Sequence, residues 1–253
     1  AYMDKTTDYE KEFINLIDKI CDGRIDRREA YTSFLVYSIK KTNLSCFLKN
    51  DISRINELNM KIQSSHIVEE DLEKLFNIMI DALENNPDQD YLGWVYEKLN
   101  LTNAKTGQFL TPYHVSKLMA EMNLHSLETM PPNGIKTIGD PACGTGGMLI
   151  ATVNVLKEKH QDSGDFMIYA QDIDWTMAMS CFVQLSLHGA AGMVVVGNSL
   201  DLNTVPSQLV DKGDAWLFPM TFVYHPELLK QMNSKFITKK QQNTRKKRED
   251  IVR

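Results

Sequence analysis

A glycine-rich turn at residues 140–147 constrains the fold of this chain more than any other feature. The turn reads DPACGTGG and lies between an apolar segment, residues 135–139, and a run of apolar and small residues that begins at Met148. A strand that ends in such a turn and continues as a helix brings backbone amides close to a bound ligand. The sequence therefore predicts a strand–turn–helix unit with a ligand site at the turn.

The segments after the turn repeat the alternation of strand and helix. The apolar runs at 165–172 and 192–197 are typical of buried strands, and residues 175–189 predict an apolar helix between them. Continuous apolar strands that alternate with helices predict an α/β fold with a doubly wound parallel sheet. Ligands bind at the carboxyl ends of such strands, where Asp140, Asp172 and Asn198 are all expected.

The first 100 residues predict helices. Apolar residues recur with a helical period at 8–20, 26–41 and 68–86, and residues 90–100 predict a short final helix. Asp26, three residues before Glu29, is typical of a capped helix start. We expect three parts: an α-helical N-terminal domain at 1–100, an α/β domain at 101–229 and a basic tail at 230–253.

The composition indicates the class of protein and the compartment in which we expect it. Hydrophobic residues make up 43% of the 253 residues, which is enough for a core, and no apolar run approaches membrane-spanning length. The four cysteines are far apart and form no CxxC pair, so we expect no metal site, no disulfide framework and a cytoplasmic protein.

The charge is unevenly distributed. The net charge of −5 argues against a uniformly basic nucleic-acid-binding surface, but residues 230–253 hold nine Lys and Arg against Glu249 and Asp250. This tail either contacts phosphates or is simply a solvated end. We expect any DNA contact through it to be weak.

The acidic residues near the turn indicate the class of ligand. Asp140 disfavours a phosphate beside it, and the phosphate-binding pattern GxxxxGK[ST] is missing. A ligand with an ammonium or sulfonium centre suits the turn, and Asp172 or Asp174 can bind the two hydroxyls of a ribose. S-adenosylmethionine has these groups and no phosphate. The alternative is that Asp140 only caps the next helix and that the glycines only allow a tight turn.

Several motifs in this order resemble a known family. The pair GQFLTP and DPACGTGG resembles the N6-adenine DNA methyltransferases, specifically the modification subunit of type I restriction-modification systems. Further similar segments are YLGWVYEKL, YAQDID and VVGNSL, and the resemblance covers roughly residues 90–200. It implies the Rossmann-like fold of the class I S-adenosylmethionine-dependent methyltransferases, here in a short form behind a helical N-terminal domain.

The resemblance implies a cofactor-binding role for each matched position. The methionine end of S-adenosylmethionine would be held by Phe109, Thr111 and Pro112, and its amino acid and sulfonium by Asp140, Ala142, Gly144 and Gly146. Its nucleoside would be held by Asp172 at the ribose, Ile173 on the adenine ring and Asn198 near the adenine edge. Cys143, inside the motif, is interpreted as a packing residue, and His114 and His188 as surface or core histidines.

The resemblance stops where the catalytic residues are expected. The family binds the target amine with Asn/Asp-Pro-Pro-Tyr/Phe after the fourth strand, and no such tetrapeptide follows residue 200. Residues 213–222 read GDAWLFPMTF instead, in which Trp216, Phe218 and Phe222 either form a buried strand or stack on a base. No catalytic residue is assigned.

Three functions are compatible with these features. The resemblance implies transfer of a methyl group to adenine N6 in DNA, with a specificity subunit, another partner or a second copy of the chain completing the site. The second reading is a catalytically silent module that binds the cofactor or a protein. The third is methylation of RNA or protein.

Overall fold

The computed structural model describes residues 6–45, 55, 57, 67–102, 109–124, 135–159, 163–201 and 214–226. The predicted basic tail at 230–253 lies outside these residues. Helices α1 (Thr6–Cys21), α2 (Arg27–Ser45), α4 (Glu69–Asn85) and α5 (Tyr91–Lys98) form the N-terminal part. Within the described ranges, no helix has both the length and the apolar character required to cross a bilayer.

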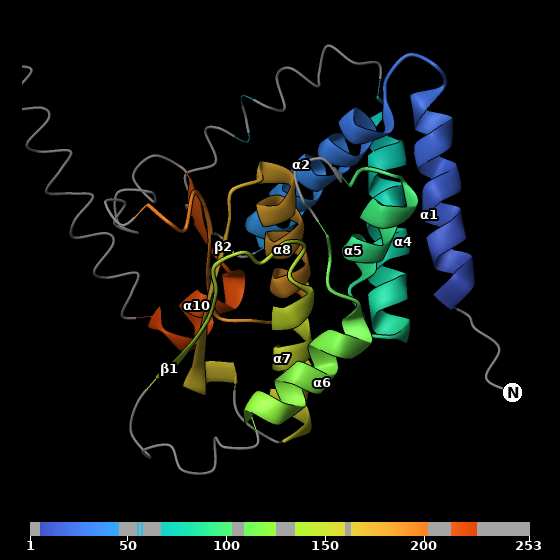
Figure 1. Ribbon diagram of the computed structural model, residues 1–253. Coiled ribbons are helices and arrows are strands. Elements are labelled where there is room, and N and C mark those ends of the chain that lie inside the picture. Colours follow the sequence, from blue (N-terminus) through green and yellow to red (C-terminus); the bar gives the residue numbers. More distant parts are fainter. Residues whose placement is uncertain are drawn as a thin grey trace, which may run out of the picture.

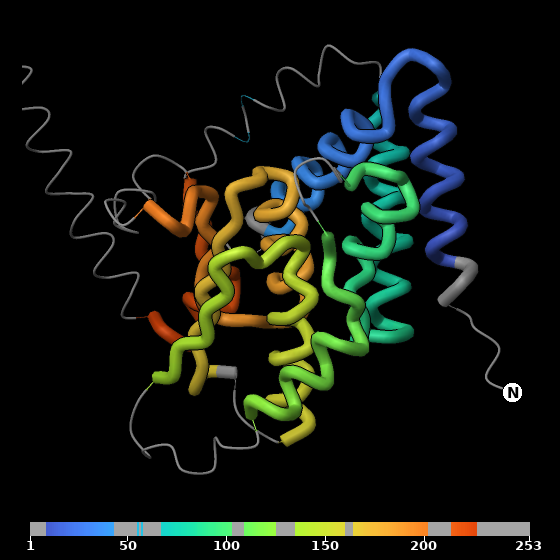
Figure 2. Tube along the Cα trace, viewed as in Figure 1, coloured from blue at the N-terminus to red at the C-terminus, as the bar shows by residue number. Residues whose placement is uncertain are grey.

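The remaining elements alternate as predicted. In chain order they are α6 (Tyr113–Leu124), β1 (Lys136–Asp140), α7 (Gly147–Glu158), the short helix η3 (Ser163–Asp165), β2 (Phe166–Asp172), α8 (Trp175–Leu187), β3 (Gly192–Val196), β4 (Ala215–Leu217) and α10 (Pro219–Tyr224). Figure 2 traces this order along the chain, from the helices in blue to β4 and α10 in orange and red.

Helix α2 is the central element of the N-terminal part. It packs against α1, α4 and α8, and Tyr31, Phe34 and Leu35 are fully buried. A helix that is enclosed on several sides has no single apolar stripe, because most of its surface faces other elements. Its start is capped as predicted, since Asp26 Oδ1 accepts a hydrogen bond from Glu29 N at 2.7 Å.

The sheet has the strand order β1-β2-β3-β4. The pairs β1–β2 and β2–β3 are parallel, and β4 is antiparallel to β3. Crossovers between parallel strands are almost always right-handed, so two that step in the same direction place both helices on one face. Figure 1 shows α7 and α8 together on one side of the sheet, with the N-terminal helices beyond them.

The α/β class with a largely parallel sheet is confirmed. The described strands account for one half of the expected doubly wound sheet. The other half would add strands on the side of β1 that faces away from β2, and none of the described residues pairs with β1 on that side.

The aromatic residues after β3 are buried. Trp216 lies in β4 and is 1% exposed, and Phe218 directly after the strand is fully buried. Phe222 differs from the expected strand, because Pro219 begins helix α10 and Phe222 lies in that helix, half-buried. The prediction of a buried strand is therefore confirmed for Trp216, which is not available to stack on a base.

The helical part and the sheet share one hydrophobic core. A single cluster of buried apolar side chains extends from Phe13 in α1 to Phe218 after β4. Polar contacts cross the same boundary, because the Tyr31 hydroxyl lies 3.0 Å from Ser180 Oγ in α8. The packing is therefore continuous across residue 100, and the division into an α-helical domain and an α/β domain at this position stays a prediction.

Candidate functional site

The glycine turn between β1 and α7 depends on two left-handed residues. Gly144 has a φ of +55° and Gly146 a φ of +97°, conformations that side chains with a β carbon rarely adopt. The turn is closed by a hydrogen bond from Gly146 N to Cys143 O at 2.9 Å, and Cys143 N donates to Gln171 O of β2 at 2.9 Å. The backbone therefore reverses within a few residues while remaining attached to the sheet.

Asp140 ends β1 and bends the chain into the turn. Its Oδ1 accepts a hydrogen bond from Ala142 N at 3.1 Å. Helix α7 begins at Gly147, its N-cap residue is Gly146, and no side chain caps it. The interpretation of Asp140 as a helix cap is therefore wrong, and one of its carboxylate oxygens has no hydrogen bond among the described residues.

Asp172 joins the turn to the end of β2. Its Oδ2 accepts from Gly144 N at 2.8 Å, and its Oδ1 accepts from Asp174 N at 2.9 Å. Asp174 has a different role, because its carboxylate caps α8 by accepting from Thr176 N at 2.7 Å. Of the two acids after β2, Asp172 is thus the one that contacts the glycine turn.

Asn198 lies beside Asp172 at the same edge of the sheet. Asp172 pairs with Val196 in the parallel register, and Gly197 N donates to Asp172 O at 2.9 Å. Asn198 follows directly, with its Oδ1 accepting from Leu200 N at 3.0 Å. The structure therefore brings Asp140, Asp172 and Asn198 to one edge, as the sequence predicts.

The environment of Asp140 and Asp172 disfavours the charged forms of both acids. Burial raises the pKa of Asp140, the hydrogen bond from Ala142 opposes this shift, and the charge of Asp172 adds to it. Burial likewise raises the pKa of Asp172, although backbone amides stabilise its charged form. The ion pairs between described residues include neither acid. A cation bound near both carboxylates would offset the cost of burying their charges and the repulsion between them.

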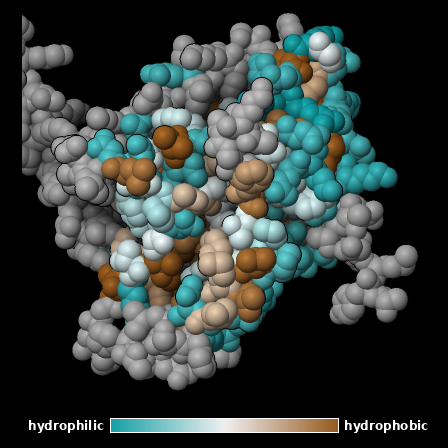
Figure 3. Space-filling model, in the orientation of Figure 1, coloured by the Kyte–Doolittle hydropathy of each residue, from teal (hydrophilic) through white to brown (hydrophobic). Residues whose placement is uncertain are grey.

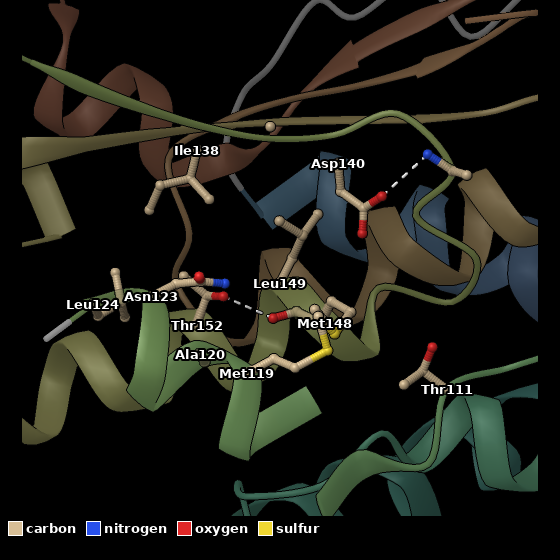
Figure 4. A pocket seen from close by; sticks show the side chains of 12 residues that line it. Thr111, Met119, Ala120, Asn123, Leu124, Ile138, Asp140, Met148, Leu149 and Thr152 are labelled. Carbon is tan, nitrogen blue, oxygen red and sulfur yellow. Dashed lines mark hydrogen bonds between the residues drawn. The ribbon is translucent and has the colours of Figure 1, made fainter. Parts of the chain in front are cut away.

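A pocket of about 430 Å³ opens between β1, α6 and α7. Three predicted cofactor residues line it: Thr111, Asp140 and Ala142. Figure 4 shows the Asp140 carboxylate pointing from the end of β1 toward the helices. The remaining lining is largely apolar and includes Met119, Ile138, Met148 and Leu149. The volume and the small number of polar groups are typical of small-molecule sites.

The other predicted cofactor residues lie outside this pocket. Phe109 and Ile173 are 79% and 70% exposed, and Pro112 is exposed where α6 begins. Gly144 and Gly146 belong to the turn itself. Figure 3 shows apolar side chains gathered on the lower part of this face, over α6 and beside β1, where Leu118, Met119, Met122 and Ile135 are exposed.

His188, His114 and Cys143 offer no catalytic arrangement among the described residues. His188 is buried, and its ring nitrogens lie within hydrogen-bond distance of two backbone carbonyls, Nδ1 at 2.8 Å from Gln184 O and Nε2 at 2.9 Å from Pro87 O. His114 is exposed, and Cys143 is buried. No group of three metal-binding side chains occurs among the residues that the structure describes.

Two contacts at the turn were not predicted from the sequence. A β carbon at Gly144 would lie 3.1 Å from Leu110 Cδ2, so Leu110 covers the turn. Beneath the turn, Thr145 Oγ1 donates to Asp90 Oδ2 at 2.6 Å, and Gln184 Nε2 donates to Asp90 Oδ1 at 2.8 Å. Asp90 has one local signal, its position as the N-cap of α5, but nothing in the sequence indicates its contact with the turn.

These features define a class of protein: an α/β domain with a largely parallel sheet that presents a glycine turn and half-buried acids to a small ligand. A family model described as N-6 DNA Methylase matches residues 87–212, which include the turn, β2 and β3. The chain belongs to this family of N6-adenine DNA methyltransferases.

The chain is similar to methylase subunits of type I restriction enzymes. Type I restriction enzyme MjaVIII methylase subunit of Methanocaldococcus jannaschii is 29% identical over 200 residues, which cover 75% of this chain and 29% of that protein. The MjaVII methylase subunit of the same organism is 30% identical over 153 residues, 59% of this chain and 24% of that protein. The chain thus spans less than a third of the length of these relatives.

Two solved structures are similar in outline. The type I restriction-modification system methyltransferase subunit from Streptococcus thermophilus has a TM-score of 0.44 and 13% identity, covering 80% of this chain and 61% of that chain. A protein from Listeria monocytogenes, described as a class I S-adenosylmethionine-dependent methyltransferase, has a TM-score of 0.45 and 17% identity, covering 78% of this chain and 56% of that chain.

Proposed function

We propose that this chain binds S-adenosylmethionine and supplies the cofactor half of a type I N6-adenine DNA methyltransferase, which acts with partner subunits in the cytoplasm. The observation that supports this most directly is the pair of half-buried acids beside the left-handed glycine turn, neither of which takes part in an ion pair among the described residues. S-adenosylmethionine brings an ammonium and a sulfonium to such a site, together with a ribose whose hydroxyls an acid can bind. The bound cofactor supplies an electrophilic methyl group.

The residues present fit this cofactor in three respects. Asp140 has an oxygen without a hydrogen-bond partner among the described residues and faces the pocket, where it can bind the ammonium or the sulfonium. Gly144 and Gly146 allow the backbone to approach the ligand. Asp172 is held by backbone amides, and its remaining lone pairs can accept the ribose hydroxyls.

The other proposed contacts surround the same edge of the sheet. Thr111 and Ala142 line the pocket, and Phe109 and Pro112 flank it at the start of α6. Ile173 projects into solvent directly after Asp172, where it can pack on the adenine ring, and Asn198 is adjacent through Gly197. A ring of the ligand can pack against an exposed apolar side chain, whereas a side chain in the core is already covered.

The acceptor half is proposed to come from elsewhere. Trp216 and Phe218 are buried, so within the described residues they offer no surface on which a flipped base could stack. A specificity subunit, the remainder of a longer methylase or a second copy of the chain would then position the DNA. The same observation favours one second candidate, a module that binds the cofactor without turnover.

Calorimetric titration with S-adenosylmethionine tests the proposal. S-adenosylhomocysteine shares the ammonium and the nucleoside, and ATP shares only the nucleoside and adds negative charge. We expect heat of binding with the first two ligands and none with ATP, because phosphates meet Asp140 and Asp172. Absence of binding to both S-adenosyl ligands would contradict the cofactor assignment, and equal binding of ATP would contradict its electrostatic basis.

A further inference from the structure

Asp90 forms a buried network beneath the glycine turn, outside the pocket. Asp90 is 9% exposed, and its carboxylate accepts three hydrogen bonds. Gly93 N donates to Oδ1 at 2.9 Å and so caps α5, Gln184 Nε2 donates to Oδ1 at 2.8 Å, and Thr145 Oγ1 donates to Oδ2 at 2.6 Å. One side chain therefore connects the start of α5, the glycine turn and the middle of α8.

Two glycines make room for this carboxylate. A β carbon at Gly93 would come within 2.2 Å of Asp90 Oδ2, and one at Gly147 would lie 2.8 Å from the same atom. Both distances are shorter than real β carbons show, so both glycines allow the close approach of the acid. Gly147 is the first residue of α7 and does not have a left-handed φ. The glycine at this position is therefore explained by the space that the Asp90 carboxylate needs, and not by the backbone conformation.

Thr145 is the part of the turn that this network holds. It lies between the two left-handed glycines, Gly144 and Gly146, and glycine loses more conformational freedom on ordering than any other residue. Its hydroxyl is bonded to Asp90, and its carbonyl accepts from Gln184 Nε2 at 2.9 Å. Gln184 is itself fixed, because Leu92 N donates to its Oε1 at 3.0 Å.

The turn is thus held from two opposite directions. On the sheet side, Gly144 N donates to Asp172, and on the helical side, Thr145 donates to Asp90. A glycine-rich turn that must be ordered when a ligand binds lowers the affinity by the entropy of that ordering, unless other contacts order the turn beforehand. Asp172 is also proposed to bind the ligand, whereas Asp90 contacts the turn through Thr145 and Gln184 and has no proposed contact with the ligand.

We propose that Asp90 is a positioning residue that orders the glycine turn through Thr145 and thereby raises the affinity of the site for its cofactor. The inference rests on the proposed function for the identity of the ligand but not for the ordering of the turn. It also assigns a role to α5: the packing of the N-terminal helices reaches the ligand site through the N-cap of this helix.

Substitutions at Thr145 test the contact most cleanly. Thr145→Val keeps the shape of the side chain and removes the donor, whereas Thr145→Ser keeps the hydroxyl. Asp90→Asn keeps the cap of α5 and removes the charge. Thr42→Val is the matched control, because it removes another buried hydroxyl whose hydrogen bonds, to Ser38 O and Ile39 O, stay within α2. Thermal unfolding without ligand establishes that each variant folds.

The first readout is the affinity for S-adenosylmethionine. We expect Thr145→Val and Asp90→Asn each to weaken it by about tenfold, the size of one charge-assisted hydrogen bond. Thr145→Ser and Thr42→Val should bind as the wild type does. The double variant of Asp90 and Thr145 should bind no more weakly than Thr145→Val alone, because the two residues act through one contact. Additive losses would overturn the proposal.

The second readout needs no ligand. Amide hydrogen exchange across residues 143–147 should be faster in Thr145→Val and Asp90→Asn than in the wild type, and unchanged in Thr42→Val. Unchanged exchange in the first two variants would overturn the positioning role. If the wild type binds no cofactor but exchange responds as expected, the proposed function fails while the role of Asp90 in ordering the turn stands.

Discussion

The substitution Asp140→Asn distinguishes the contribution of this acid to the affinity for the cofactor from its effect on the stability of the free protein. The amide has almost the same shape, and its Oδ1 can still accept the hydrogen bond from Ala142 N that bends the chain after β1. What the substitution removes is the negative charge. We therefore expect opposite effects on the affinity for the cofactor and on the stability of the free protein.

The loss of affinity follows from one charged contact. A hydrogen bond to a charged group contributes about 1.5–3 kcal/mol, which corresponds to a decrease of about tenfold to about 150-fold in affinity for S-adenosylmethionine. S-adenosylhomocysteine lacks the sulfonium but keeps the ammonium. An equal loss for both ligands would place Asp140 at the ammonium, and a larger loss for S-adenosylmethionine would place it at the sulfonium.

The effect on stability has the opposite sign. Burial and the charge of Asp172 raise the folded-state pKa of Asp140 above its unfolded value. A group of this kind favours the folded state below its unfolded pKa, and this contribution is lost as the pH rises through the folded pKa. At neutral pH the ionised carboxylate is therefore a cost, and Asp140→Asn should unfold at a higher temperature than the wild type.

Thermal unfolding without ligand, at neutral pH and at an acidic pH near the unfolded value for Asp, checks this reasoning. The advantage of the Asn variant should be present at neutral pH and shrink as the pH falls. Calorimetry on the same samples gives the affinity. A variant that is less stable at neutral pH and binds the cofactor normally would refute both parts of the argument.

Three further predictions concern the sheet, the DNA contact and catalysis. Gly192→Ala should lower the free energy of unfolding by at least about 2 kcal/mol in urea denaturation, because φ is +131° and the β carbon would lie 1.9 Å from Ile168 O. Gly23 is the control: it is also left-handed, but its β carbon would have no atom within 4 Å, so Gly23→Ala should lower the free energy of unfolding by only about 1 kcal/mol. Binding to duplex DNA should weaken steeply with salt and disappear on deletion of residues 239–253, so equal affinity without them would exclude the tail as the contact. Radiolabelled methyl transfer to adenine-rich DNA by this chain alone should be lower by about a hundredfold or more than with its partner, for lack of a preorganised acceptor for the amine; robust turnover that is lost in Asp140→Asn would show that another segment replaces the missing tetrapeptide.

Local patterns were sufficient for much of the fold. The helical period of the N-terminal segments, the capping of α2 by Asp26 and the order of strands and helices after residue 135 all depend on residues a few positions apart. The same holds for the glycine turn. Because parallel strands end at one edge, the alternation alone also predicts that Asp140, Asp172 and Asn198 meet there.

Tertiary structure decided the features that depend on distant segments. Asp90 and Thr145 are 55 positions apart, and no spacing rule distinguishes Asp90 from the other members of a set of 33 acidic residues. The role of Asp140 required the observation that α7 begins at Gly147 without a side-chain cap. The order of strands was likewise not encoded locally, because a strand is specified by its own alternation and apolarity, whereas its neighbours are selected by packing of the whole sheet against α7 and α8. Sequence thus determined which residues approach the ligand edge, and the three-dimensional packing determined which side chains hold them in place.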